Sequence, residues 1–351
     1  MAIGNLVTAS RYNSMRNALL TVLGTNNSGT DGYGQFVVSD AKADTDTVSH
    51  QDMVELYIDL YRARVHQTGN PPSWNGGDGL SFPSSGDIIG EFAAAVGATD
   101  SSDATTNLGS GYVDFENAIA DVQSAASQFS VSQMTQESLI SSTRTSTWNG
   151  TISHIVTITF PGYTITNPDT TTEAVSGTEH RRYFFNTGGN IQFEASLTGG
   201  TSTTVGTKDY TWSQMLSNMG TIIFDSESTA PTGTGTGSAL GNTNLTTTYQ
   251  TIFTKAGSGV YAENDYTIRA RSTSGDTVQF EITFNDDDSG DPPITPIPPG
   301  GIVGGVDENV QGSTNSFINI LYADGDDVTI DGDTYSSVVV PVPTAANNST
   351  L

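Results

Sequence analysis

The sequence has no cysteine, few basic residues and no long apolar run, and each absence excludes a class of protein. Without cysteine there can be no disulfide, no cysteine-based zinc site and no thiol nucleophile. Lys and Arg together number 12 against 38 Asp and Glu, which gives a net charge of −26. Nucleic acids and anionic membrane surfaces bind to basic patches, so we expect neither as a partner. No run approaches the roughly 18 apolar residues of a membrane-spanning helix.

The composition that is present favours a chain of several domains that is rich in β-strands and loops. The chain has 351 residues, 38 of them glycine, and only 14% of its residues are charged. Residues 151–285 contain short aromatic and β-branched runs separated by Gly, Asn, Pro and Thr, which is typical of strands. Within Val278–Phe284 the apolar residues alternate strictly, as in a strand with one buried face. We therefore predict an antiparallel β-sandwich, jelly-roll-like, in this region.

Two finer features of the predicted sandwich can be read from local patterns. The Asn186–Asn190 break between two apolar runs predicts a hairpin loop, so that Arg182–Leu197 would form two strands. In that hairpin Phe184 and Phe193 would belong to the core. The segment Trp212–Met219 has apolar residues at helical spacing and predicts one short helix at an end of the sandwich.

The N-terminal region, residues 1–150, has helical patterns instead. Thr8 is placed to cap a first helix, and Ser49 with Asp52 resembles a capping box for a second. A short helix over Ile88–Val96 and a further one from Tyr112 are also expected. Because helices this short are marginal alone, their apolar stripes must pack together or against another subunit.

The remaining residues predict two further regions and complete an α+β multidomain fold. Residues 286–305 are rich in Asp, Pro and Gly and predict an extended linker. Residues 306–351 predict a small β-rich acidic tail that would pair with a copy of itself or with a neighbour. The predicted order is thus a helical docking region at 1–150, a sandwich at 151–285, a linker and a tail.

No catalytic or cofactor-binding residues are predicted. The four histidines have neither metal-ligand nor triad spacing, and no carboxylate pair stands in an apolar setting. The best ligand-like cluster, weak as a Ca²⁺ site, is Asp324, Asp326, Asp331 and Asp333. Asp-Gly is also a common hairpin-turn dipeptide, and two turns explain the same residues.

Six segments within residues 1–285 resemble virion structural proteins of contractile-tailed marine cyanobacterial phages: Leu6–Asn13, Val22–Gly24, Gly32–Gln35, Arg62–Gly69, Arg182–Gly189 and Thr247–Ile252. The resemblance implies a component of the neck, the tail or the baseplate periphery, and it implies no catalytic residues. The first eight residues lack the features of a signal peptide, so we expect synthesis in the host cytoplasm and a final location in the virion.

We therefore expect a non-enzymatic structural protein that forms homo-oligomers and binds other virion proteins. The expected assembly contacts are Trp74, Phe82, Phe317 and Tyr322. The alternative is a module of the tail that binds host-surface glycan through loops carrying Trp212, Tyr261 or Tyr266. A glycan-cleaving enzyme is a third hypothesis, disfavoured because it needs a pair of carboxylates.

Overall fold

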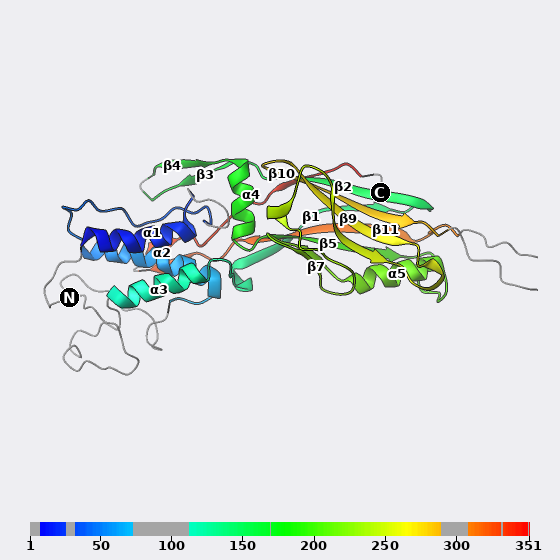
Figure 1. Ribbon diagram of the computed structural model, residues 1–351, viewed down its shortest axis with the longest axis horizontal. Helices are drawn as coiled ribbons and strands as arrows, with labels where there is room; N and C mark the ends of the chain where they lie inside the picture. Colours follow the sequence, from blue (N-terminus) through cyan, green and yellow to red (C-terminus); the bar gives the residue numbers. More distant parts are fainter. Residues whose placement is uncertain are drawn as a thin grey trace, which may run out of the picture. The chain divides into compact units, whose positions relative to one another are not determined.

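The computed structural model describes residues 8–25, 32–72, 112–168, 170–288, 308–330, 333–349 and 351, and it has an α+β fold that consists mostly of strands (Figure 1). The chain divides into two compact units, and each is built from three separate stretches. The helical unit comprises Met1–Thr135, Gly162–Gly188 and Tyr322–Pro341. The sandwich unit comprises Gln136–Pro161, Gly189–Leu321 and Val342–Leu351.

The helical unit contains four helices and two small hairpins in its described part. The helices are α1 (Ala9–Leu23), α2 (His50–Thr68), α3 (Tyr112–Ser124) and α4 (Gly177–Asn186). The hairpins are β3 (Tyr163–Thr166) with β4 (Thr172–Val175), and β12 (Val328–Ile330) with β13 (Asp333–Tyr335). Helices α1, α2 and α3 pack against one another and bury their apolar stripes. None of the helices that the structure describes is both long enough and apolar enough to cross a membrane.

Both predicted helix starts in the N-terminal region are confirmed. The Thr8 hydroxyl accepts a hydrogen bond from the Arg11 amide, and Ser49 and Asp52 form a capping box at α2. Each cap satisfies amide groups that have no partner inside the helix. The predicted helix over Ile88–Val96 lies outside the described residues.

The predicted hairpin over Arg182–Leu197 is wrong, because its first half is helix α4. Ser176 and Glu179 form a capping box that begins the helix. The break at Asn186–Asn190 then ends the helix, with Gly188 in the left-handed region at φ 87°. Phe193 is fully buried in the sandwich unit, as predicted, whereas Phe184 is fully buried on α4 in the helical unit and does not belong to the sandwich core.

The sandwich unit contains two five-stranded sheets and helix α5 (Lys208–Met219). One sheet has the order β1-β11-β5-β6-β7, with strands β1 (Met134–Arg144), β5 (Asn190–Thr198), β6 (Ile222–Phe224), β7 (Thr229–Pro231) and β11 (Ser313–Ala323). The other has the order β14-β2-β10-β9-β8, with strands β2 (Gly150–Thr159), β8 (Gln250–Ala256), β9 (Asp265–Ser274), β10 (Thr277–Asp286) and β14 (Thr344–Asn347). Strands β5-β6-β7 and β8-β9-β10 are neighbours within their sheets, so each series forms a meander.

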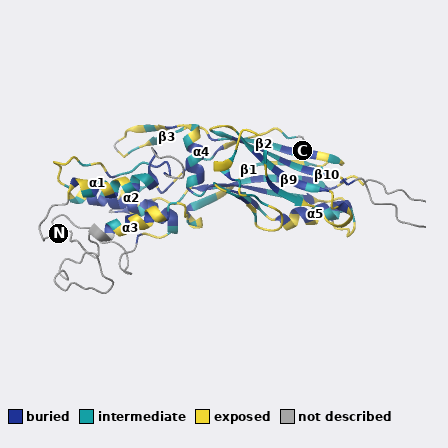
Figure 2. Ribbon diagram, viewed as in Figure 1, coloured by how far each residue is buried: buried dark blue, intermediate teal, exposed yellow. Residues whose placement is uncertain are grey.

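Aromatic side chains fill the space between the two sheets. The ring of Phe280 on β10 meets Phe193 on β5 and Phe224 on β6 edge to face, at centroid distances of 4.9 and 5.2 Å. Buried and partly exposed positions alternate along β10, which confirms the predicted periodicity of Val278–Phe284 (Figure 2). Helix α5 confirms the predicted short helix, and it packs against β5 and β8.

The structure divides the chain differently from the predicted domain order. The predicted tail, residues 306–351, is not a separate domain: β11 pairs with β5 along nine positions from Ser313 to Leu321, and β14 pairs with β2. Its middle stretch, Tyr322–Pro341, belongs to the helical unit. The physical reason is that β11 alternates buried and partly buried residues, and such a strand needs a large sheet to bury one face.

Candidate functional site

The expected assembly contacts do not form one cluster in the described structure. Trp74 and Phe82 lie outside the described residues. Phe317 is partly buried on the face of β11 that points away from the sandwich core. Tyr322 is only 9% exposed and lies at an alternate position of the same strand, so it points to the opposite side. Of the two contacts that the structure describes, Phe317 is therefore the one that a partner could reach.

Three of the four acidic residues expected for calcium belong to the part of the chain that the structure describes. Asp324, Asp326 and Asp333 are exposed, and Asp331 lies outside the described residues. Strands β12 and β13 pair antiparallel, with Ile330 opposite Asp333. Within the described ranges no group of three or more His, Asp or Glu residues is placed to hold a metal ion.

The three aromatic residues expected for glycan binding all lie in the sandwich core. Trp212, Tyr261 and Tyr266 are 1%, 3% and 0% exposed. Trp212 meets Trp148 at a centroid distance of 5.4 Å, and Tyr266 meets Phe284 at 5.1 Å. A sugar cannot stack on rings that are covered on both faces, so these residues do not form a glycan site.

Three of the four histidines are buried, and each forms a hydrogen bond to a residue of its own unit that is distant in sequence. His66 on α2 donates through Nε2 to the Thr187 carbonyl at 3.1 Å, and burial lowers its pKa to about 4. His154 on β2 faces the core and has its Nδ1 2.9 Å from the Ser316 hydroxyl of the other sheet. Burial lowers the pKa of His154 to about 4 as well. Neutral histidines of this kind bind segments together and are poor candidates for acid–base catalysis near neutral pH.

Helix α2 also carries a buried ion pair. Asp59 and Arg62 are fully buried with a nearest separation of 3.7 Å between Oδ1 and Nη1. Arg62 donates to the carbonyls of Phe36 and Ser336, while Asp59 accepts from the amides of Val38 and Ser39. Burial raises the pKa of Asp59, and the charge of Arg62 together with these hydrogen bonds opposes that rise. The pair holds irregular backbone around α2.

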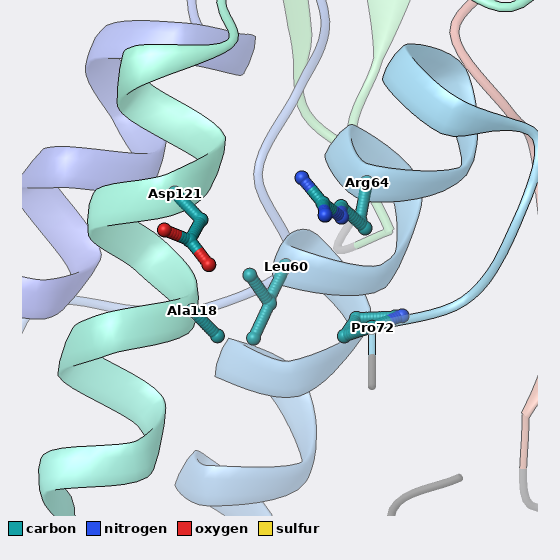
Figure 3. A pocket seen from close by; sticks show the side chains of 5 residues that line it. All are labelled: Leu60, Arg64, Pro72, Ala118 and Asp121. Atoms are coloured by element: carbon teal, nitrogen blue, oxygen red, sulfur yellow. The ribbon is translucent and has the colours of Figure 1, made fainter. Parts of the chain in front are cut away.

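A small hollow lies between α2 and α3. Figure 3 shows the five side chains that line it: Leu60 and Arg64 from α2, Ala118 and Asp121 from α3, and Pro72 at the side. Its volume of about 50 Å³ is far below the several hundred Å³ of typical small-molecule sites. It has room for a few water molecules.

The most unusual cluster of charged side chains lies in the sandwich unit. Lys208, the first residue of α5, is 1% exposed, and its Nζ lies 3.0 and 3.2 Å from the two carboxylate oxygens of Asp286. The Oδ2 atom of Asp288 is 3.7 Å from the same Nζ. The Asp288 amide is held by the side-chain carbonyl of Asn264 at 3.0 Å. Asp286 and Asp288 are 3% and 6% exposed, so an amine and two carboxyl groups meet out of contact with bulk water.

Sequence reasoning missed this cluster because residues 286–288 were interpreted as the start of a linker. One signal was available. Asp286 continues the alternation of Val278–Phe284 by one further step and therefore falls on the apolar face of β10. A charged residue at the next core position of a regular strand indicates a local exception to the fold's pattern, and such exceptions concentrate at functional sites.

No protein-family model, no curated protein and no solved structure matches this chain.

Proposed function

We propose that this chain is a non-enzymatic structural component of a phage particle, located in the virion at the neck, tail or baseplate, and that it assembles with copies of itself and with other virion proteins. The observation that carries the proposal is the path of the chain, which passes five times between the helical unit and the sandwich unit. Neither unit can form from one contiguous piece. A part that must keep its shape under load benefits from this arrangement, because losing one stretch disrupts the unit that it completes.

The C-terminal residues support the same proposal, since they belong to the sandwich. Beyond β14, the Asn348 amide donates to the Ile155 carbonyl at 2.8 Å, and the Ser349 hydroxyl donates to the Ser153 carbonyl at 2.9 Å. The Ser142 hydroxyl on β1 donates to the Leu351 carbonyl at 3.1 Å. Asn348, Ser349 and Leu351 thus connect β2 of one sheet with β1 of the other.

The candidate assembly surface is the outer face of the sheet β1-β11-β5-β6-β7. Phe317 and Leu321 on β11 and Ile223 on β6 share this face according to the strand registers. All three are partly buried, and polar residues such as Asn319 surround them. Large apolar side chains on the outside of a sheet, rimmed by polar ones, are typical of protein interfaces. In our proposal a second copy of the chain covers them. A jelly-roll-like connection of the sandwich strands stays a prediction.

Two measurements test the proposal. Antibodies against the purified chain should label intact particles of the encoding virus at one repeated position in electron micrographs. The purified chain should self-associate in sedimentation velocity, and Phe317→Ser should weaken that association at least tenfold, while Asn319→Ser on the same face should not. Unlabelled particles, together with a strictly monomeric chain that binds no other particle protein, would contradict it.

The glycan-binding alternative receives no support from the residues that motivated it, because all three lie in the core. It would need a different surface. A glycan array probed with the purified chain separates the two hypotheses, since a structural component need not retain any sugar.

A further inference from the structure

The Lys208 cluster contains the three groups that an amide-forming reaction needs. Lys208 is the one buried lysine of the three in the chain: the Lys42 side chain is 21% exposed, and Lys255 on β8 is partly exposed. Both carboxylate oxygens of Asp286 lie within 3.2 Å of the Lys208 Nζ, so the carboxyl carbon faces the amine. Asp288 brings a second carboxyl group to the same nitrogen.

The surroundings of the pair are those of a protein core. Asp286 follows the buried Phe284 on the inner face of β10, and the ring of Tyr261 lies 5.9 Å from the Lys208 Nζ. Charges buried in this way are costly, and the desolvation penalty of an ion pair often exceeds its Coulomb attraction. Transfer of a proton from the ammonium to the carboxylate therefore costs less here than in water. It leaves a neutral amine in contact with a carboxylic acid.

We propose that Lys208 and Asp286 condense into an intramolecular amide bond, with Asp288 as the proton relay. This activity would be a covalent self-modification of the folded chain, and it goes beyond the proposed role in a particle.

The reaction balances without any oxidant, reductant or cofactor. The lone pair of the neutral Lys208 Nζ attacks Cγ of the protonated Asp286 carboxyl, and the C–N bond forms. The Asp288 carboxylate takes a proton from the nitrogen of the adduct, which keeps one N–H, and gives that proton to the departing hydroxyl. The C–O bond then breaks, and one water is released. The folded structure supplies proximity in place of an activating group, because the reacting atoms are already held in contact.

The bond would tie α5 to the end of β10 across 78 positions of sequence. Like a disulfide, it would restrict the unfolded chain. Unlike a disulfide, it could form in a reducing cytoplasm, and this chain has no cysteine that could serve the same purpose.

Intact-mass spectrometry of the denatured full-length chain tests the proposal directly. We expect a mass below that of the sequence by one water molecule. Tryptic digestion should then give one branched product that joins residues 183–255 to residues 272–351. An acylated Lys208 blocks cleavage after it, and the chain has no Lys or Arg beyond Arg271. A full sequence mass after prolonged incubation of the folded chain would overturn the proposal.

Variants separate this bond from other losses of water, such as succinimide formation at Asp-Gly. Lys208→Arg keeps a positive charge but removes the nucleophilic amine, so it should restore the full mass. Lys255→Arg is the matched control and should retain the deficit. A deficit that survives in Lys208→Arg would contradict the assignment. Because the wild-type mass is informative alone, a failure of Lys208→Arg to fold leaves the test intact.

The role of Asp288 is tested by the rate of bond formation. In freshly synthesised Asp288→Asn the branched product should accumulate at least tenfold more slowly than in the wild type, while Asp287→Asn should react normally because Asp287 is exposed. A wild-type rate in Asp288→Asn would exclude the proton relay. The outcome is independent of particle assembly, since a monomeric chain can form the bond and an assembled chain can lack it.

Discussion

The helical unit and the sandwich unit both bury polar side chains, but they differ in where these side chains lie and in what they satisfy. Around α2 the helical unit encloses Asp59, Arg62, His66 and Gln67, whereas the space between the two sheets is filled mainly by aromatic and aliphatic residues. The difference follows from the backbone. In the sandwich the strand ladders satisfy the buried amides and carbonyls. In the helical unit irregular segments run through the interior, and side chains must satisfy carbonyls such as those of Phe36 and Ser336.

The largest predicted loss of stability comes from a substitution in the polar interior of the helical unit. Arg62→Met leaves Asp59 buried without its partner and should lower the free energy of unfolding by about 5 kcal/mol. Chemical denaturation measures the loss. Arg64→Met on the same helix is partly exposed and is the matched control. The double variant Asp59→Asn with Arg62→Met should lose less than Arg62→Met alone, and equal losses would refute the role of the pair.

The second largest loss of stability is expected from a substitution in the apolar interior of the sandwich unit. Phe280→Ala removes the ring that meets both Phe193 and Phe224, and we expect a loss of about 4 kcal/mol from lost burial and a residual cavity. Thr283→Ala on the outer face of the same strand should change stability by less than about 0.5 kcal/mol. If both variants unfolded at the same denaturant concentration, the two sheets would not share this core.

The third prediction concerns acid and tests one histidine in each unit. Folding lowers the pKa of His66 and of His154 to about 4, from an ordinary value near 6.5, because both are desolvated. Between these values the unfolded chain binds more protons, so stability is lost as pH falls from about 6.5 towards 4, by up to about 3 kcal/mol for each histidine.

Thermal unfolding at pH 7 and at pH 4.5 measures this acid sensitivity. His66→Gln and His154→Asn remove the titrating group while retaining a polar side chain. Each should shrink the difference between the two pH values, whatever its effect at pH 7. Variants with an unchanged pH difference would show that other groups cause the acid loss.

The smallest predicted loss of stability tests whether the Ser176 cap stabilises helix α4. Ser176→Ala removes the side chain that accepts from the Glu179 amide and should destabilise the chain by about 1 kcal/mol. Thr178→Ala, at an exposed position in the first turn of α4, is the control. A neutral result for Ser176→Ala would mean that packing of Phe184 alone holds the helix.

Local patterns in the sequence determined the helix caps, the alternation of β10 and the short helix α5. Each of these depends on interactions within a few residues, such as the Thr8 hydroxyl with the Arg11 amide. The α+β class followed from the same patterns. The candidate reaction centre was not predicted, although the position of Asp286 on the apolar face of β10 was visible in the sequence.

Tertiary structure alone decided the path of the chain. The sequence could not show that β11 pairs with β5 or that β14 pairs with β2. Pairing between strands that are distant in sequence depends on long-range packing, which local patterns do not reveal. The same holds for Lys208 and Asp286, whose contact across 78 positions exists only in the folded sandwich. Short-range chemistry therefore fixed the elements, while long-range packing fixed their partners.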